Sequence, residues 1–255
     1  MQNIYHNFFE PVGFYGVIHN EAYQSIYHGC IDALEAMARA NNLSIYVIDY
    51  YKQNFLYVSS DFMFLNGHTV DEIKEMGYAY YTNFVPVEDL RFLKLINKKG
   101  FEFFYQTPPE DRLKYSISYD FYITDIKHKK KTLVNHKLTP IKLNSRNQVW
   151  LAICVISPVH QKTYGEVVIH KSDSNQIHVF DRFLQQWFQM EKLVFSDVDL
   201  EILKLSALGY SNSGIAEKMY YDENTIKYHK KQIFARMKVK NITEAVVYAM
   251  GHKII

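Results

Sequence analysis

Hydrophobic and polar positions follow two different periods in the first part of the chain. Between residues 21 and 40 apolar residues recur every three or four positions, which predicts an amphipathic helix with an apolar stripe of Tyr23, Ile26, Tyr27, Cys30, Leu34 and Met37. Residues 43–49 and 55–59 are rich in β-branched and aromatic residues and are joined by a polar segment. This second pattern predicts a β-hairpin.

Short helices are expected to follow the hairpin. Residues 62–66 form a short helical piece before Gly67, and residues 70–76 form a helix that Gly77 ends. Thr69 and Glu72 have the spacing of a capping box, in which each side chain accepts from a backbone amide at the helix start. After Pro86, residues 87–98 predict a further helix, with Gly100 beyond its end.

Strand patterns dominate the region from residue 115 to residue 156. Strict alternation over 115–124 predicts a half-buried strand. Residues 131–143 predict a second strand, in which Pro140 favours an edge position or a bulge. Residues 149–156 are apolar at every position, which indicates a strand buried on both faces. One of those faces needs a cover, either the helix of residues 21–40 or a partner subunit.

The segment between residues 159 and 194 is expected to be a structured connector. Residues 166–170 and 176–180 flank a polar turn and predict a hairpin, and residues 183–193 are expected to form a helix. A flexible Gly/Ser linker is not present in this segment. A structured connector would couple the parts of the chain on either side of it.

The last sixty residues predict three short helices and a turn. Ser196 with Asp199 forms a capping signal, Gly209 ends the first helix after an apolar stripe of Ile202, Leu203, Leu205 and Leu208, and Ser211 and Asp222 start the next two. In the third helix Ile226, Ile233 and Met237 share one side, with His229 on its flank as a packing residue. The opposite side carries Asn224, Lys227, Tyr228 and Lys231.

Charge distinguishes this third helix from an ordinary surface helix. No Asp or Glu occurs from residue 224 to residue 243, where six residues are basic: Lys227, Lys230, Lys231, Arg236, Lys238 and Lys240. The net charge of the whole chain is only +2, so the basic character is local. One face of the helix therefore suits a protein core and the other suits a polyanion.

These residues resemble the LuxR/NarL-type DNA-binding domain. The likeness is carried by Phe195-Ser196, residues 201–205, residues 209–212, Ile215-Ala216, residues 225–227, His229 and residues 241–245. It implies that Lys227, Tyr228 and Lys231 enter the major groove, that Thr225 and nearby basic residues such as Lys230 contact phosphates, and that residues 243–252 carry a dimer contact. Two residues depart from the family pattern: Gly214 replaces a charged helix former, and Lys238 replaces a glycine, which predicts a differently built turn.

Residues 43–158 resemble a PAS sensor domain. The likeness is carried by residues 57–62, the turn of residues 65–68 and residues 85–89, with Ser59 where asparagine is common. It implies a small-molecule pocket under the sheet that Tyr57, Tyr115, Tyr119 and Phe121 face, although plain core packing explains the same residues. No cofactor can be named: residues 79–90 lack the cysteine of a covalent flavin sensor, and no histidine stands out as an axial ligand for haem.

The remaining composition narrows the function class. The 255 residues suggest two domains, no apolar run is long enough to span a bilayer, and the two cysteines do not have zinc-ligand spacing, all of which fit a cytoplasmic protein. No catalytic or metal-binding constellation is evident, so an enzyme is not expected.

The expected fold is α+β: a PAS-like antiparallel sheet with flanking helices, followed by a small all-α helix-turn-helix domain. The expected boundaries are an N-terminal segment and helix (1–42), a sensor domain (43–158), a connector (159–194) and a DNA-binding domain (195–255). The sequence predicts a homodimeric transcription regulator that binds double-stranded DNA and responds to a small molecule or partner. The alternative is a PAS-containing interaction module that does not bind DNA.

Overall fold

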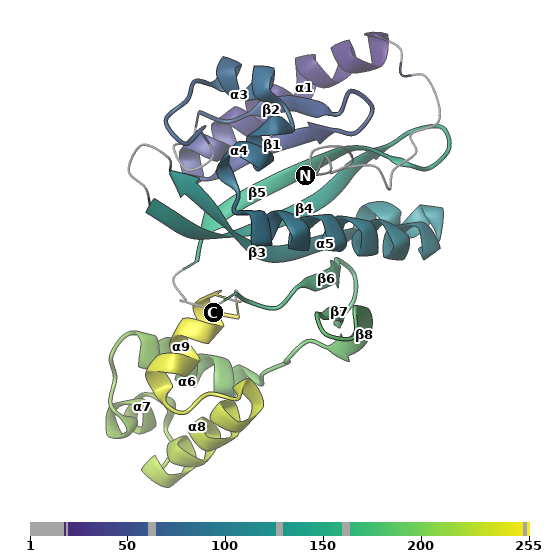
Figure 1. Ribbon diagram of the computed structural model, residues 1–255. Helices are drawn as coiled ribbons and strands as arrows, with labels where there is room; N and C mark the ends of the chain where they lie inside the picture. The colour runs from purple at the N-terminus through teal and green to yellow at the C-terminus, as the bar shows by residue number, and fades with distance from the viewer. Residues whose placement is uncertain (1–17, 19, 61–64, 126–129, 160–163, 252–253) are drawn as a thin grey trace. The chain divides into compact units, whose positions relative to one another are not determined.

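The computed structural model describes residues 18, 20–60, 65–125, 130–159, 164–251 and 254–255, with the backbone alone for 20–22 and 25–29. These residues form two compact units that divide between Met190 and Glu191 (Figure 1). Among them, no helix combines the length and the apolar character needed to cross a membrane. The predicted helix over residues 62–66 falls largely outside the described residues.

The N-terminal unit is built on one eight-stranded sheet with the strand order β2-β1-β5-β4-β3-β6-β7-β8. The strands are β1 (Ser44–Asp49), β2 (Asn54–Val58), β3 (Tyr115–Asp125), β4 (Lys130–Leu143), β5 (Val149–Pro158), β6 (Val168–Lys171), β7 (Gln176–Asp181) and β8 (Gln186–Glu191). The predicted hairpins β1–β2 and β6–β7 are confirmed, and both pair antiparallel. An α+β fold with an antiparallel sheet and a separate helical unit is therefore confirmed.

Three irregularities in strand register decide which face each residue occupies. Pro140 pairs with Ala152 and Lys142 pairs with Leu151, which makes Ile141 an extra residue in β4. Leu143 then pairs with Val149, which makes Trp150 an extra residue in β5. Of the two alternatives for Pro140, the bulge is therefore the one observed, and β4 is an interior strand. In β2, Tyr57 pairs with Val47 while Phe55 pairs with Ile48, so Leu56 is an extra residue there.

Helix α1 (Asn20–Asn41) covers one face of the sheet, as the first of the two predicted alternatives required. Tyr23 packs edge-on against Trp150, and its hydroxyl donates to Asp49 Oδ2 over 2.6 Å. The predicted stripe is partly wrong, because Cys30 is exposed and Met37 is 53% exposed. The residues that contact the sheet on the turns after Cys30 are Ile31, Leu34 and Ala38, so the buried stripe lies one position away from Cys30 and Met37.

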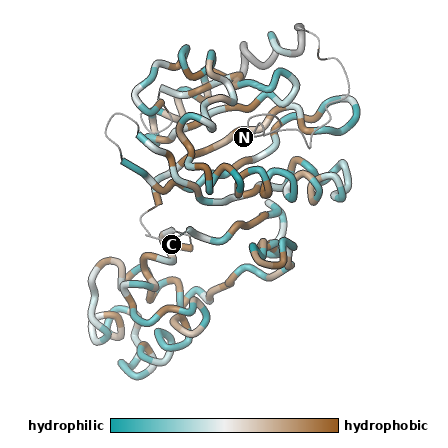
Figure 2. Tube along the Cα trace, in the orientation of Figure 1, coloured by the Kyte–Doolittle hydropathy of each residue, from teal (hydrophilic) through white to brown (hydrophobic). Residues whose placement is uncertain are grey.

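Helices α3 (Val70–Met76), α4 (Ala79–Phe84) and α5 (Val87–Gln106) cover the opposite face. The Thr69–Glu72 capping box and the stop at Gly77 are confirmed. Hydrophobic and hydrophilic segments alternate along α5, as in an amphipathic helix (Figure 2). α5 does not end before Gly100 as predicted. The helix continues through Gly100 beside β3, where an added Cβ would lie 3.4 Å from Ile117 Cδ1, an ordinary contact.

A hydrogen-bonded chain of polar side chains lies inside this core. The Tyr46 hydroxyl lies 2.5 Å from the Tyr81 hydroxyl and 2.6 Å from His136 Nε2. The second ring nitrogen of His136, Nδ1, has no hydrogen-bond partner among the described residues, and burial lowers the His136 pKa to about 3. His136 is therefore held neutral, and its ring lies tilted against Tyr119 with the ring centroids 4.9 Å apart.

The segment after β5 extends the sheet instead of leaving it. β6 pairs with β3, and the predicted helix over residues 183–193 is wrong, because β8 occupies residues 186–191. Contacts of Trp187 stabilise the strand: its ring packs on Phe180 and Phe103, and its Nε1 donates to the Lys99 carbonyl in α5. Its neighbour Phe188 is exposed, as strand alternation requires.

The C-terminal unit contains α6 (Asp197–Ala207), α7 (Asn212–Met219), α8 (Glu223–Met237) and α9 (Ile242–Gly251). The predicted caps at Ser196, Ser211 and Asp222 are confirmed. Leu208 was assigned to the buried stripe and is 73% exposed, because α6 ends at Ala207 and Leu208 follows it. The core of the unit is formed by the side chains of Ile202, Leu203, Ile215, Ile226, Ile233 and Ala245.

Candidate nucleic-acid interface

Helix α8 is fixed at its start by a cap and along one side by the core. Asp222 accepts hydrogen bonds from the Thr225 amide over 2.9 Å and from the Thr225 hydroxyl over 2.6 Å. Ile226, Ile233 and Met237 are buried against the other helices. The apolar side predicted for this helix is therefore the side that holds it to the unit.

The opposite side of α8 is open to solvent and basic. Asn224, Lys227, Tyr228 and Lys231 are all exposed there, and Tyr228 is 61% exposed. Lys227 Nζ lies 2.7 Å from Glu223 Oε1 one turn earlier, with both side chains about half exposed. Exposed pairs of this kind are weak, so the Lys227 ammonium can exchange Glu223 for a phosphate.

Lys230 does not share the open face. It is only 8% exposed, and its ammonium donates to Asn212 Oδ1 in α7 over 2.8 Å. Burial lowers the Lys230 pKa. Lys230 therefore ties α7 to α8, and the structure removes it from the residues available to a phosphate; Thr225 stays at the helix start, half-buried against Asp222.

The N-terminal end of the unit is joined to α8 by a polar cluster around Asp199, which we call the Asp199 clamp. His229 Nδ1 lies 2.8 Å from Asp199 Oδ1, and Arg236 Nη1 lies 3.6 Å from Asp199 Oδ2. Arg236 also donates to the Val194 carbonyl and stacks over the Phe195 ring. The capping spacing revealed the Asp199–Ser196 contact, whereas the partners on α8 lie thirty and more residues away and left no local signal.

Two helices end in a conformation that glycine usually adopts, but with another residue in that position. Tyr220 closes α7 and Lys238 closes α8, both in the left-handed region with φ of 56° and 55°. A differently built turn was expected at Lys238. The structure shows the conformation a glycine would adopt, with lysine in it.

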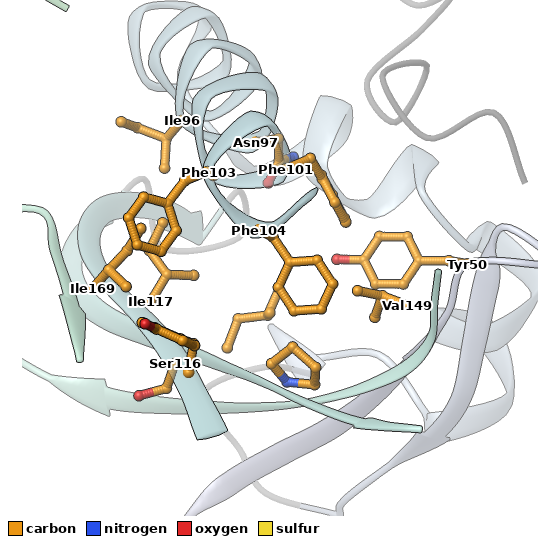
Figure 3. A pocket seen from close by; sticks show the side chains of 14 residues that line it. Tyr50, Ile96, Asn97, Phe101, Phe103, Phe104, Ser116, Ile117, Val149 and Ile169 are labelled. Atoms are coloured by element: carbon orange, nitrogen blue, oxygen red, sulfur yellow. The ribbon is translucent and has the colours of Figure 1, made fainter. Parts of the chain in front are cut away.

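A small cavity lies in the N-terminal unit between α5 and strands β3, β4 and β5 (Figure 3). Its volume is about 50 Å³. The Tyr50 hydroxyl points into it beside the Phe104 ring. No charged side chain is among its lining residues, which are Tyr50, Ile96, Asn97, Gly100, Phe101, Phe103, Phe104, Tyr115, Ser116, Ile117, Leu138, Pro140, Val149 and Ile169.

Only one of the four residues predicted to face a ligand lines this cavity. Tyr115 does, while Tyr119 and Phe121 pack on the same side of the sheet beside His136. Tyr57 lies on the opposite side and donates to Glu35 Oε2 in α1, because the extra residue Leu56 turns it away. The phenylalanines of α5 were missed, since the helix was expected to end before them.

Among the residues that the structure describes, no group of three His, Cys, Asp or Glu side chains is placed to hold a metal ion.

The C-terminal segment of the chain matches a known protein family. Residues 193–249 match the family described as "Bacterial regulatory proteins, luxR family". The resemblance expected for the C-terminal segment is therefore confirmed, and the PAS resemblance stays a prediction.

Curated relatives match mainly over the same segment. Oxygen regulatory protein NreC of Staphylococcus epidermidis is 39% identical over 62 residues, which are 24% of this chain and 28% of NreC. Response regulator protein VraR of Staphylococcus saprophyticus is 31% identical over 100 residues, 39% of this chain and 46% of VraR. The chain thus spans less than half the length of these relatives.

Two solved structures match over most of the chain at low sequence identity. The phage VqmA–DPO complex gives a TM-score of 0.33 at 13% identity, covering 92% of this chain and 91% of the other. The Vibrio cholerae VqmA dimer solved without target DNA gives 0.32 at 11% identity, covering 92% and 88%. TM-scores this low do not establish a shared fold.

Proposed function

We propose that this protein is a cytoplasmic transcription regulator that binds double-stranded DNA as a homodimer and responds to a small molecule held by a PAS-like N-terminal unit. The open basic face of α8, held to the core by its other side, is the observation that supports DNA binding most directly. The family match over residues 193–249 supports the same assignment.

The division of labour on α8 follows from its side chains. Exposed Lys227 and Lys231 neutralise phosphates or donate to acceptors on base edges, and the phenol of Tyr228 adds an apolar and a polar contact. Release of counterions makes such binding weaker as salt rises. α9 leaves Val247 and Met250 exposed, which supports a role for that helix in dimer formation.

The Lys231→Ala variant is expected to bind its operator about 5- to 150-fold more weakly, a loss of about 1–3 kcal/mol, because it removes a base-edge contact. Sequence preference at one position should relax as well. Genome-wide DNA capture followed by footprinting at two salt concentrations identifies the operator and measures both effects.

Lys204→Ala is a suitable control, since it removes an exposed lysine from α6 without touching α8. Unchanged affinity and preference for Lys231→Ala would refute the assigned role. Absence of any footprint for the unaltered protein at moderate salt would favour the interaction module without DNA binding, and protection of a single half-site would contradict the dimer.

At about 50 Å³ the cavity is much smaller than a usual ligand pocket of roughly 300–1,000 Å³. A ligand there is expected to be uncharged and largely apolar, and to enlarge the cavity when it binds. The lining of the cavity has no charged side chain to compensate a buried charge, which would be costly to bring in. The Tyr50 hydroxyl supplies a hydrogen-bonding group at the wall (Figure 3). Helix α5 forms one wall of the cavity, so a ligand in the cavity would contact α5 and change how this helix packs against the sheet.

The Gly100→Ala variant is expected to stabilise the free N-terminal unit by about 0.5–1 kcal/mol, because alanine favours a helix interior over glycine. The added methyl group meets Ile117 Cδ1 at 3.4 Å, an ordinary contact, and narrows the cavity. Thermal unfolding measures the gain. Native mass spectrometry of both purified proteins then shows whether a co-purifying ligand is lost, and a ligand retained equally by the variant would contradict this site.

A further inference from the structure

Three helices of the C-terminal unit end in the same way, with a residue in the left-handed conformation. The residues are Gly209 after α6, Tyr220 after α7 and Lys238 after α8. Glycine adopts this conformation freely, whereas a side chain brings its Cβ close to the backbone and makes it unfavourable. Glycine occupies one of these three positions. The other two, Tyr220 before α8 and Lys238 after it, hold a side chain in this unfavourable conformation.

The folded unit gains little from these two side chains. Tyr220 is 96% exposed, and Lys238 is exposed as well. The helix caps themselves need only the backbone: the Tyr220 amide donates to the carbonyls of Ala216 and Glu217, and the Lys238 amide donates to those of Ala235 and Phe234. Glycine would make the same hydrogen bonds, so the residue types call for another explanation.

Tyr220 and Lys238 flank α8 at its start and its end. α8 has 15 residues, a length of about 22 Å at 1.5 Å per residue. The major groove is about 12 Å wide. A helix of that length which crosses the groove reaches the phosphates on both sides, and Tyr220 and Lys238 lie just outside its two ends.

We propose that Tyr220 and Lys238 contact DNA phosphates at the two ends of α8 and fix the register of the helix in the groove. This inference rests on the proposed DNA binding and adds two contacts outside the predicted face. A phenol hydroxyl and an ammonium are both donors that bind phosphate oxygens. Residues held in sparsely populated backbone regions cluster at ligand-binding sites.

The test separates stability from affinity by replacing each residue with the one the backbone prefers. Tyr220→Gly and Lys238→Gly should raise the thermal midpoint of the C-terminal unit, because each removes left-handed strain. Both should also bind the operator found by footprinting about 5-fold or more weakly with unchanged sequence preference, as for lost phosphate contacts. Lys238→Gly alone should reduce the slope of log affinity against log salt by about 1.

Two further variants make the result unambiguous. Tyr220→Phe keeps the strain and the ring but loses the hydroxyl, so it should weaken binding as Tyr220→Gly does. Gly209→Ala adds strain in open space, so it should lower the thermal midpoint and leave the affinity of the folded protein unchanged. Full affinity in Tyr220→Gly and Lys238→Gly, with the unaltered protein binding DNA, overturns this inference alone, and full affinity in Tyr220→Phe overturns the hydroxyl–phosphate contact. No binding by the unaltered protein overturns the proposed function and this inference with it.

Discussion

Lowering the pH from 7 to 4 is expected to remove on the order of 3 kcal/mol from the free energy of unfolding of the N-terminal unit through His136 alone. Burial lowers the His136 pKa from 6.5 to about 3 in the folded protein. Between these values the unfolded chain binds a proton that the folded chain does not. Stability is therefore complete above pH 6.5 and falls as the pH falls toward 3.

The His136→Phe variant is expected to lose about 3 kcal/mol less over the same pH range. Phenylalanine keeps a ring against Tyr119, and Tyr46 keeps its hydrogen bond to Tyr81. In this variant Tyr46 loses its hydrogen bond to His136 Nε2, but the cost of burying the unpartnered Nδ1 is removed as well. The free energy of unfolding at pH 7 should therefore change by no more than about 1 kcal/mol.

Urea unfolding at pH 7 and pH 4 measures the difference. Both tryptophans, Trp150 and Trp187, belong to the N-terminal unit, so tryptophan fluorescence reports that unit selectively. His68→Gln, at a partly exposed histidine in the turn before α3, controls for the loss of any histidine. Equal acid sensitivity of His136→Phe and the unaltered protein would show that His136 is not the group responsible.

Features that depend on neighbours in sequence could be predicted. The caps at Thr69, Ser196 and Asp222 each join groups three residues apart, so the pattern contains both partners. The two faces of α8 follow from its period in the same way. Local hydrogen bonds and a single amphipathic period are enough for these elements.

Features that depend on distant contacts could not be predicted. α5 continues through Gly100, and the turns beyond it bury Phe101 and Phe104 in the core. Residues 186–191 form a strand in which the Trp187 ring packs against Phe103. The partners in both cases lie far away in sequence, so a local pattern does not contain them.

The residues of the candidate sites show the same difference between local patterns, which could be predicted, and distant contacts, which could not. Asn224, Lys227, Tyr228 and Lys231 share the open face as the helical period predicts, whereas Lys230 lies one position away and turns toward Asn212. For the cavity, Tyr57 was placed by the resemblance to a PAS domain, and a single extra residue at Leu56 turns it to the other face of the sheet. A bulge of one residue is invisible to a pattern of period two.

Asp199→Ala is expected to destabilise the C-terminal unit by about 3 kcal/mol and to weaken DNA binding with it. The Asp199 carboxylate is almost fully buried, accepts from the Ser196 amide at the start of α6, and contacts His229 and Arg236 on α8. Its removal takes the acidic partner at Asp199 away from Arg236, and it breaks one half of the capping box, the bond from the Ser196 amide, while the Ser196 hydroxyl still caps α6. Since His229 and Arg236 both lie on α8, the helix that carries the DNA face loses two of its polar anchors.

Asp197→Ala provides a matched control in the same first turn of α6, because Asp197 is exposed. It removes only a favourable charge near the helix start, for a loss of about 0.3–1 kcal/mol. Hydrogen exchange of the amides in α6 and α8 measures the free energy of opening in the full chain, and operator binding is measured in parallel. Asp199→Asn retains an acceptor for His229 and the cap and should fall between the two. If Asp199→Ala and Asp197→Ala exchange equally slowly, the Asp199 clamp does not hold α8 in place.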